Sequence, residues 1–169
     1  YPLLRKHALP ATLFVTTGFI NKELWLWPDK ITWLLNRYPV IPGKISLGKN
    51  DLHQGPVTKE NKSELWDLII GYLLTLNDLD KLTWIIGFSE KLGIELPEIP
   101  PSEYCAVTWS QLKEMQNNEV AIGGHTVTHP SLGRVDDVQL KYEVGGCKQT
   151  LDCELGTLKR DFCYPNGQP

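Results

Sequence analysis

Three short apolar segments, separated by helical sequence, constrain the fold of this chain more than any other feature. They cover residues 11–16, 120–122 and 161–164, and apolar and polar residues alternate little within them. Such runs are typical of parallel strands that are covered on both faces. An order of strand, helices, strand, helix, strand predicts an α/β fold, either a parallel sheet or a barrel.

Helical patterns fill the sequence between these strands. Helices are expected near residues 63–76, 78–92 and 136–155, and Gly93 and Gly156 follow the last two as C-terminal glycines do. A capping box, Thr-Trp-Ser-Gln, predicts another helix start at Thr108. The helix at 136–155 is expected to bury a stripe formed by Leu140, Val144, Cys147, Leu151 and Leu155.

One long helical stretch stands apart from the strand pattern. Residues 22–105 are interpreted as a helical, Trp-rich insertion within a single domain over residues 1–169. Residues 39–58, rich in Gly, Pro, Lys and Asn, are expected to form an exposed excursion. Four of the six Trp residues lie before residue 70 of the insertion, where they form its core or line a sugar-binding rim.

Composition excludes several classes of function. The chain has 17 basic and 20 acidic residues, and this net charge of −3 argues against binding of nucleic acid. No apolar stretch approaches the roughly 20 residues needed to span a bilayer. The four cysteines form no Cys-x-x-Cys pair, so buried free thiols are expected.

The ends of the chain predict that it is a piece of a longer protein. It begins at Tyr1 without an initiator Met, and it stops just after a turn-like Pro-Asn-Gly. The compartment therefore stays open. The free cysteines slightly favour the cytoplasm, and secretion or attachment to the cell envelope is the alternative. The sequence does not indicate an oligomeric state.

Candidate chemistry lies at the carboxyl ends of the strands, where parallel α/β folds bind ligands. After the second strand the chain reads Gly-Gly-His-Thr-Val-Thr-His-Pro over residues 123–130. His125 and His129 are four residues apart, a spacing that lets two imidazoles meet one divalent metal. Two ligands are one fewer than a catalytic metal needs, and Asp136 and Asp137 are expected to begin the next helix instead.

The segment 123–132 closely resembles the His-Ser/Thr-x-x-His-Pro motif of polysaccharide deacetylases, which form carbohydrate esterase family 4 and share the NodB homology domain. Residues 1–15 and 109–115 resemble the elements between that family's motifs, and Phe-Cys-Tyr-Pro-Asn-Gly at 162–167 resembles its third motif. These matches cover about half of the chain, in the family's order. The resemblance implies a partial distorted (β/α)7 barrel, with the helical insertion outside the match.

The resemblance also implies a function and a site. It implies a metal-dependent hydrolase that removes acetyl groups from a saccharide substrate, either an N-acetyl amino sugar or an O-acetyl sugar. His125 and His129 would be metal ligands, with Thr126 supporting the turn between them. Zinc is the favoured metal, and cobalt and nickel also suit imidazole. The backbone N–H of Asn166 would stabilise the oxyanion. The implied substrate-binding residues are Tyr164, Pro165 and Gly167.

The chain departs from the family pattern in ways that leave alternatives open. The family's Asp-Asp motif would lie upstream of Tyr1 and its general-acid histidine beyond Pro169, so this chain alone is predicted to be inactive and to bind metal weakly. Cys163 stands where many members have an arginine, and Arg160 is a poor substitute. One alternative is a non-catalytic, carbohydrate-binding deacetylase-like domain. Another is a cyclic-amide hydrolase of the same fold.

Overall fold

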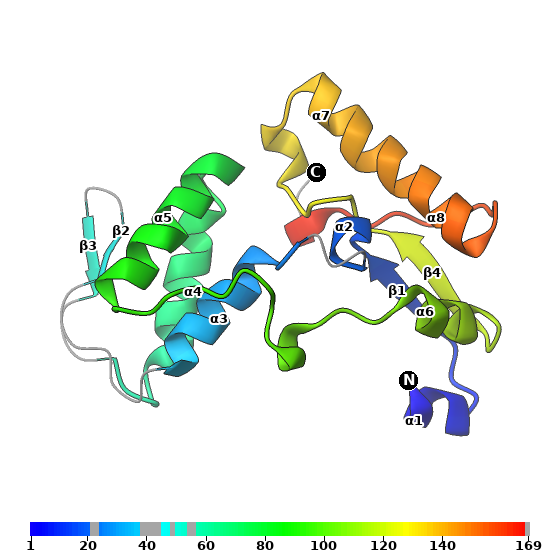
Figure 1. The fold of residues 1–169 in the computed structure, drawn as a ribbon, viewed down its shortest axis with the longest axis horizontal. Helices are drawn as coiled ribbons and strands as arrows, with labels where there is room; N and C mark the ends of the chain where they lie inside the picture. Colours follow the sequence, from blue (N-terminus) through cyan, green and yellow to red (C-terminus); the bar gives the residue numbers. More distant parts are fainter. Residues whose placement is uncertain (21–23, 38–44, 48–49, 54–56, 168–169) are drawn as a thin grey trace. The chain divides into compact units, whose positions relative to one another are not determined.

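The chain folds into two compact units, each described by itself below (Figure 1). The first unit consists of Tyr1–Leu24 with Ser102–Pro169, and the second of Trp25–Pro101. The interpretation of residues 22–105 as an insertion stays a prediction. The computed structural model describes residues 1–20, 24–37, 45–47, 50–53 and 57–167.

Two parallel strands form the centre of the first unit. Strand β1 (Ala11–Val15) pairs with β4 (Val120–Gly124) so that Val15 lies opposite Gly124. The first two predicted strands and their parallel pairing are therefore confirmed, and the chain has the mixed α/β content expected. Because the strands are parallel, both carboxyl ends lie at the same edge, and Thr16 and His125 follow them there.

The predicted third strand, residues 161–164, is reduced to a single parallel bridge between Phe162 and Gly124. Gly124 donates to Asp161 O at 2.9 Å and accepts from Cys163 N at 2.9 Å. Beyond this bridge the guanidinium of Arg160 donates to Ile122 O at 3.0 Å, so a side chain occupies the carbonyl to which further pairing would bring a backbone N–H. A seven-stranded barrel thus stays a prediction.

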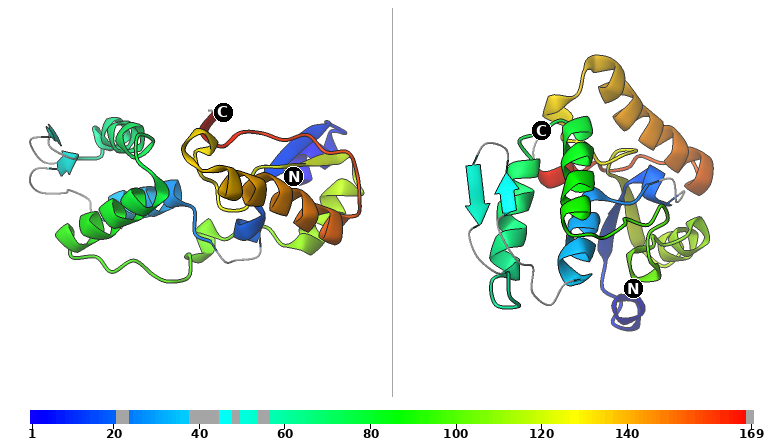
Figure 2. Two further views of the ribbon diagram at one scale, coloured as in Figure 1. Left: turned by 90° about the horizontal axis from the view of Figure 1, so that it is seen from above. Right: turned by 60° about the vertical axis from the view of Figure 1, so that its left-hand side comes forward.

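Helices pack around the strand pair. Helices α6 and α8 both contact β4, and α8 runs beside the strands in Figures 1 and 2. Thr108 and Gln111 form the predicted capping box at the start of α6. The helical elements of the first unit are α1 (Pro2–Lys6), α2 (Thr17–Ile20), η1 (Ser102–Tyr104), α6 (Trp109–Gln116), η2 (Leu132–Arg134), α7 (Asp137–Lys141), the π-helical turn η3 (Tyr142–Gly146), α8 (Cys147–Leu155) and η4 (Pro165–Gly167).

The predicted helix at 136–155 is thus interrupted by a π-helical turn, which corrects the predicted stripe. Its later members are buried, whereas Leu140 and Val144 are each 38% exposed. A π turn takes more residues than an α turn to complete one rotation, so the inward position before Cys147 falls to Glu143 instead of Val144. Gly156 ends the helix at φ +83°, as expected for a C-terminal glycine.

In its described residues the second unit has three helices and a hairpin. They are α3 (Trp27–Arg37), β2 (Ile45–Leu47) antiparallel to β3 (Asn50–His53), α4 (Lys62–Leu73) and α5 (Asp78–Lys91). The predicted helices at 63–76 and 78–92 are confirmed within a few residues, with Gly93 at φ +65° after the second. The hairpin occupies part of the predicted excursion at 39–58, much of which lies outside the described residues.

Four Trp side chains contact their own unit. Trp25 and Trp33 are buried and meet edge to face, with ring centroids 5.8 Å apart. Trp27 has the Lys81 ammonium 5.4 Å from its ring centroid, and Trp66 donates to Thr32 Oγ1 at 3.0 Å. These contacts favour a core role for the Trp residues over a sugar-binding rim.

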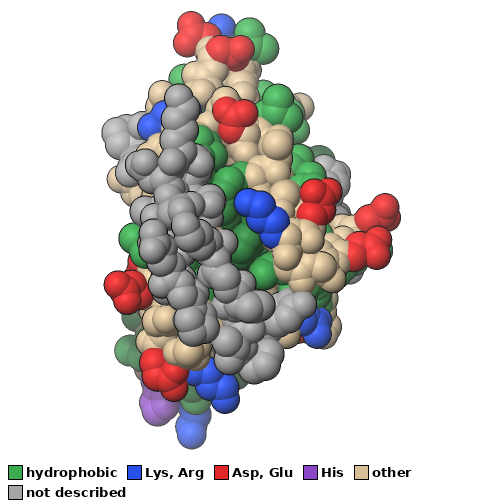
Figure 3. Space-filling view, turned by 90° about the vertical axis from the view of Figure 1, so that its left-hand side faces the viewer, with side chains coloured by type: hydrophobic (Ala, Val, Ile, Leu, Met, Phe, Trp, Pro, Cys, Tyr) green, Lys and Arg blue, Asp and Glu red, His purple; other side chains and the backbone are tan. Residues whose placement is uncertain are grey.

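In Figure 3, acidic and basic side chains are scattered over the visible face and form no single basic patch. Within the part of the chain that the structure describes, no helix is long and apolar enough to cross a membrane. All four cysteines are free, but only Cys147 is buried; Cys105 and Cys153 are exposed, which corrects the expectation of buried thiols.

Candidate metal centre

His125 lies directly at the carboxyl end of β4. Its backbone N–H continues the parallel ladder by donating to Val15 O at 3.0 Å, and its carbonyl accepts from Thr16 Oγ1 at 3.0 Å. Both contacts come from the end of β1. The backbone of this histidine is therefore held by the sheet itself.

The two histidines of the motif lie side by side. The ring centroids of His125 and His129 are 4.9 Å apart, with an angle of 70° between the planes. Nδ1 of His125 lies 2.8 Å from Cys163 O, and because a carbonyl can only accept, Nδ1 carries the proton in this contact. This leaves Nε2 of His125 with the lone pair, the arrangement that metal-binding histidines adopt.

The turn between the histidines has an unusual backbone. Thr126 (φ +70°) and His129 (φ +66°) both occupy the left-handed region, where residues other than glycine are strained by about 1–3 kcal/mol each. Thr126 is fully buried, and its Oγ1 accepts from His129 N at 3.0 Å. The structure thus contains a side-chain to main-chain bond of the kind expected at Thr126, and it joins the ends of the strained turn.

The start of α2 packs against the same turn. Thr17 N donates to Thr126 O at 3.0 Å, and Gly18 N donates to Val127 O at 2.9 Å. A Cβ at Gly18 would lie 2.6 Å from Val127 O, closer than real Cβ contacts come. Only glycine therefore allows α2 to approach the turn this closely.

Glu143 also contacts the turn, and the sequence did not indicate it as a site residue. Its side chain is buried, with 1% exposed. Oε2 accepts from Val127 N at 2.8 Å and Thr128 N at 2.9 Å, and Oε1 accepts from Thr128 Oγ1 at 2.5 Å. An α-helical period assigns the inward position to Val144, so only the π turn reveals this carboxylate.

The third motif adjoins the histidines through the backbone of Cys163, the acceptor for His125. Tyr164 follows with 47% of its surface exposed, its ring 5.6 Å from the Phe162 ring between centroids. Pro165 is buried, and Asn166 and Gly167 turn the chain at φ +59° and +65°. The predicted substrate-binding segment thus begins directly beside the predicted metal ligands.

The residues fit a divalent metal in part. Two adjacent imidazoles, one oriented by a carbonyl, are a suitable donor pair. Among the described residues, however, no third His, Cys, Asp or Glu joins them. Asp136 caps α7, accepting from Gln139 N at 2.8 Å, as its predicted role at a helix start requires.

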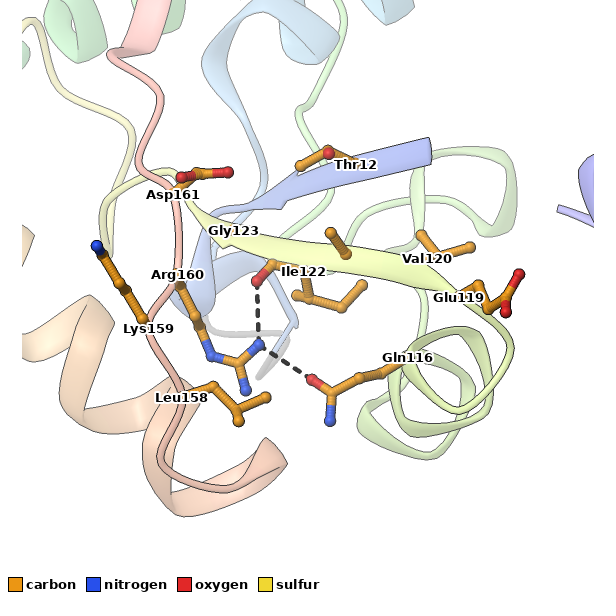
Figure 4. A pocket seen from close by; sticks show the side chains of 11 residues that line it. Thr12, Gln116, Glu119, Val120, Ile122, Gly123, Leu158, Lys159, Arg160 and Asp161 are labelled. Atoms are coloured by element: carbon orange, nitrogen blue, oxygen red, sulfur yellow. Dashed lines mark hydrogen bonds between the residues drawn. The ribbon is translucent and has the colours of Figure 1, made fainter. Parts of the chain in front are cut away.

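Arg160 lies away from this site. Its guanidinium binds Gln116 Oε1 and Ile122 O, each at 3.0 Å, and also the carbonyls of Leu155 and Gly156 at the end of α8. A cavity of about 330 Å³ lies beside it along β4, as Figure 4 shows. Its lining from β4 ends at Gly123, before the carboxyl edge, so Arg160 does not serve the histidines.

Comparison with known proteins shows the family of the chain. The family model for polysaccharide deacetylases matches residues 1–169, the whole chain. The chain therefore belongs to the polysaccharide deacetylase family, whose members are hydrolases and are generally metal-dependent. Searches among curated proteins and among solved structures find no match.

Proposed function

We propose that this protein is a metal-dependent hydrolase that removes acetyl groups from a saccharide, either an N-acetyl amino sugar or an O-acetyl sugar. The observation that carries the proposal is the pair of adjacent imidazoles, with Nδ1 of His125 held by Cys163 O. Membership of the family supports the same chemistry. In this proposal β1 and β4 belong to a distorted (β/α)7 barrel, with residues 22–105 inserted into it.

His125 and His129 would hold the metal, and zinc is the favoured ion, with cobalt or nickel as alternatives. When bound, the metal supplies a Lewis acid that polarises the acetyl carbonyl and lowers the pKa of a water molecule. The proposal requires a third ligand from outside the described residues.

The other residues of the site would bind and orient the sugar. Tyr164 has an exposed ring and directly follows Cys163, whose carbonyl contacts His125, and Pro165 and Gly167 shape the turn that follows. The backbone N–H of Asn166 would donate to the oxyanion that forms when water attacks the acetyl group. Thr126 would keep His129 in place through its hydroxyl.

Acetate release from N-acetylated and O-acetylated oligosaccharides tests the proposal. The protein is assayed at its full natural length, because residues 1–169 alone are predicted to be inactive. It is compared with and without a chelator, beside the His129→Ala variant and the control His7→Ala, which changes an exposed histidine on α1's C-terminal side. We expect release that a chelator and His129→Ala abolish and His7→Ala preserves. Sugar binding without hydrolysis would support the carbohydrate-binding alternative, and hydrolysis of a cyclic ureide alone would support the cyclic-amide alternative.

A further inference from the structure

Glu143 is a buried carboxylate whose hydrogen bonds all reach the histidine turn. The contacts go to two residues, Val127 and Thr128, which lie between the two histidines in sequence. In the described part of the chain no cationic side chain forms an ion pair with it. Burial of an ionised carboxylate is unfavourable unless hydrogen bonds replace its water. Here the turn supplies those bonds.

The Glu143 carboxylate and the Thr126 hydroxyl bind different parts of the turn. The Thr126 hydroxyl joins the two ends of the strained segment, and Glu143 binds the two successive N–H groups in its middle. Two left-handed residues strain this backbone, so the conformation is stable only if contacts from the surrounding structure hold it. Without Glu143 two buried or partly buried N–H groups would lose their partner, and the turn would gain freedom to relax.

The orientation of the Glu143 side chain depends on the π-helical turn η3. It rotates the helix so that Glu143 faces the turn while Val144 is exposed. Single π-helical turns inside α-helices are frequent at functional sites.

We propose that Glu143 is a positioning residue for the metal centre: it holds the turn in the conformation that keeps the imidazoles of His125 and His129 adjacent. This inference rests on the proposed function, in which the two histidines bind a divalent metal. Some residues do not bind the metal themselves but orient the residues that do. Their replacement typically lowers metal affinity by about 10–100-fold.

A zinc titration of the protein at its full natural length, followed by the ring ¹⁵N signals of the two histidines, tests the inference without an activity assay. We expect Glu143→Ala to weaken zinc binding by about 10–100-fold. Glu143→Gln should rescue most of the affinity, because its amide oxygen still accepts from Val127 N and Thr128 N. The matched control is Leu155→Ala, which truncates a buried side chain at the far end of α8 and should leave zinc affinity unchanged.

The outcomes separate the two proposals. Zinc binding by the wild type that Glu143→Ala leaves unchanged overturns the positioning role alone. No zinc-dependent change at either ring of the wild type overturns the proposed metal function and the positioning role with it. Equal weakening by Leu155→Ala also overturns the positioning role, because general destabilisation then explains the loss. If Glu143→Ala does not fold, Glu143→Asp must weaken binding more than Glu143→Gln, since its shorter side chain cannot reach both N–H groups.

Discussion

Substitution of Gly18 by alanine has two opposite effects on stability, one from the helix preference of alanine and one from the contact of α2 with the histidine turn. Local preference favours alanine in a helix by about 0.5–1 kcal/mol. The tertiary structure opposes it, because the new Cβ would lie 2.6 Å from Val127 O, a backbone atom that cannot rotate away. Relief of such a clash costs about 1–3 kcal/mol. Loss of the bond from Gly18 N to Val127 O adds about 1 kcal/mol. After the helix preference of alanine is subtracted, we expect a net destabilisation of about 1–3.5 kcal/mol.

Thermal and urea unfolding, followed by circular dichroism, measure this effect. For a chain of this size 1 kcal/mol corresponds to about 2–4 °C, so the melting temperature of Gly18→Ala should fall by at least about 2 °C. Gly145→Ala is the control, because a Cβ there meets nothing within 4 Å. It should leave stability unchanged or raise it slightly. Equal stability of Gly18→Ala and wild type would refute the close approach of α2 to the turn.

Three further predictions concern the same unit. Thr126→Ala removes the hydroxyl that accepts from His129 N, and we expect a loss of about 1–2 kcal/mol in urea unfolding together with weaker zinc binding. Arg160→Ala removes charge-assisted hydrogen bonds at the end of α8, and urea unfolding should show a loss of about 2–3 kcal/mol. Zinc affinity should stay unchanged. Reduced zinc affinity would contradict the conclusion that Arg160 lies away from the histidines. Burial raises the pKa of the Cys147 thiol, so at pH 8 its thiolate is scarce in the folded protein. Mass spectrometry should find Cys105 alkylated in the native protein and Cys147 only after unfolding, and early modification of Cys147 would show that the helix opens.

Signals that depend on neighbouring residues could be read from the sequence. The capping box at Thr108 and the helix end at Gly156 are local hydrogen-bonding and conformational preferences, and both occur where expected. The β-rich runs that became β1 and β4 were also recognisable, since buried parallel strands carry continuous apolar residues. The same holds for the histidine motif, whose residue types and spacing point to a metal.

Features that depend on distant groups could not be read in this way. The strand expected at 161–164 is reduced to one bridge, and the Arg160 side chain binds the neighbouring Ile122 carbonyl, a contact across 38 residues. The apolar stripe failed at Leu140 and Val144 because a regular 3.6-residue period contains no π turn.

The sequence by itself therefore determined the class of fold, the family and the two candidate metal ligands, because each rests on short patterns of residue type. Only the tertiary structure decided how those ligands are held. The left-handed turn, the approach of Gly18 and the buried carboxylate of Glu143 exist because three separate segments meet at Val127. A buried carboxylate is stable only where partners from elsewhere in the chain satisfy it, so its role is visible only once those partners have their positions.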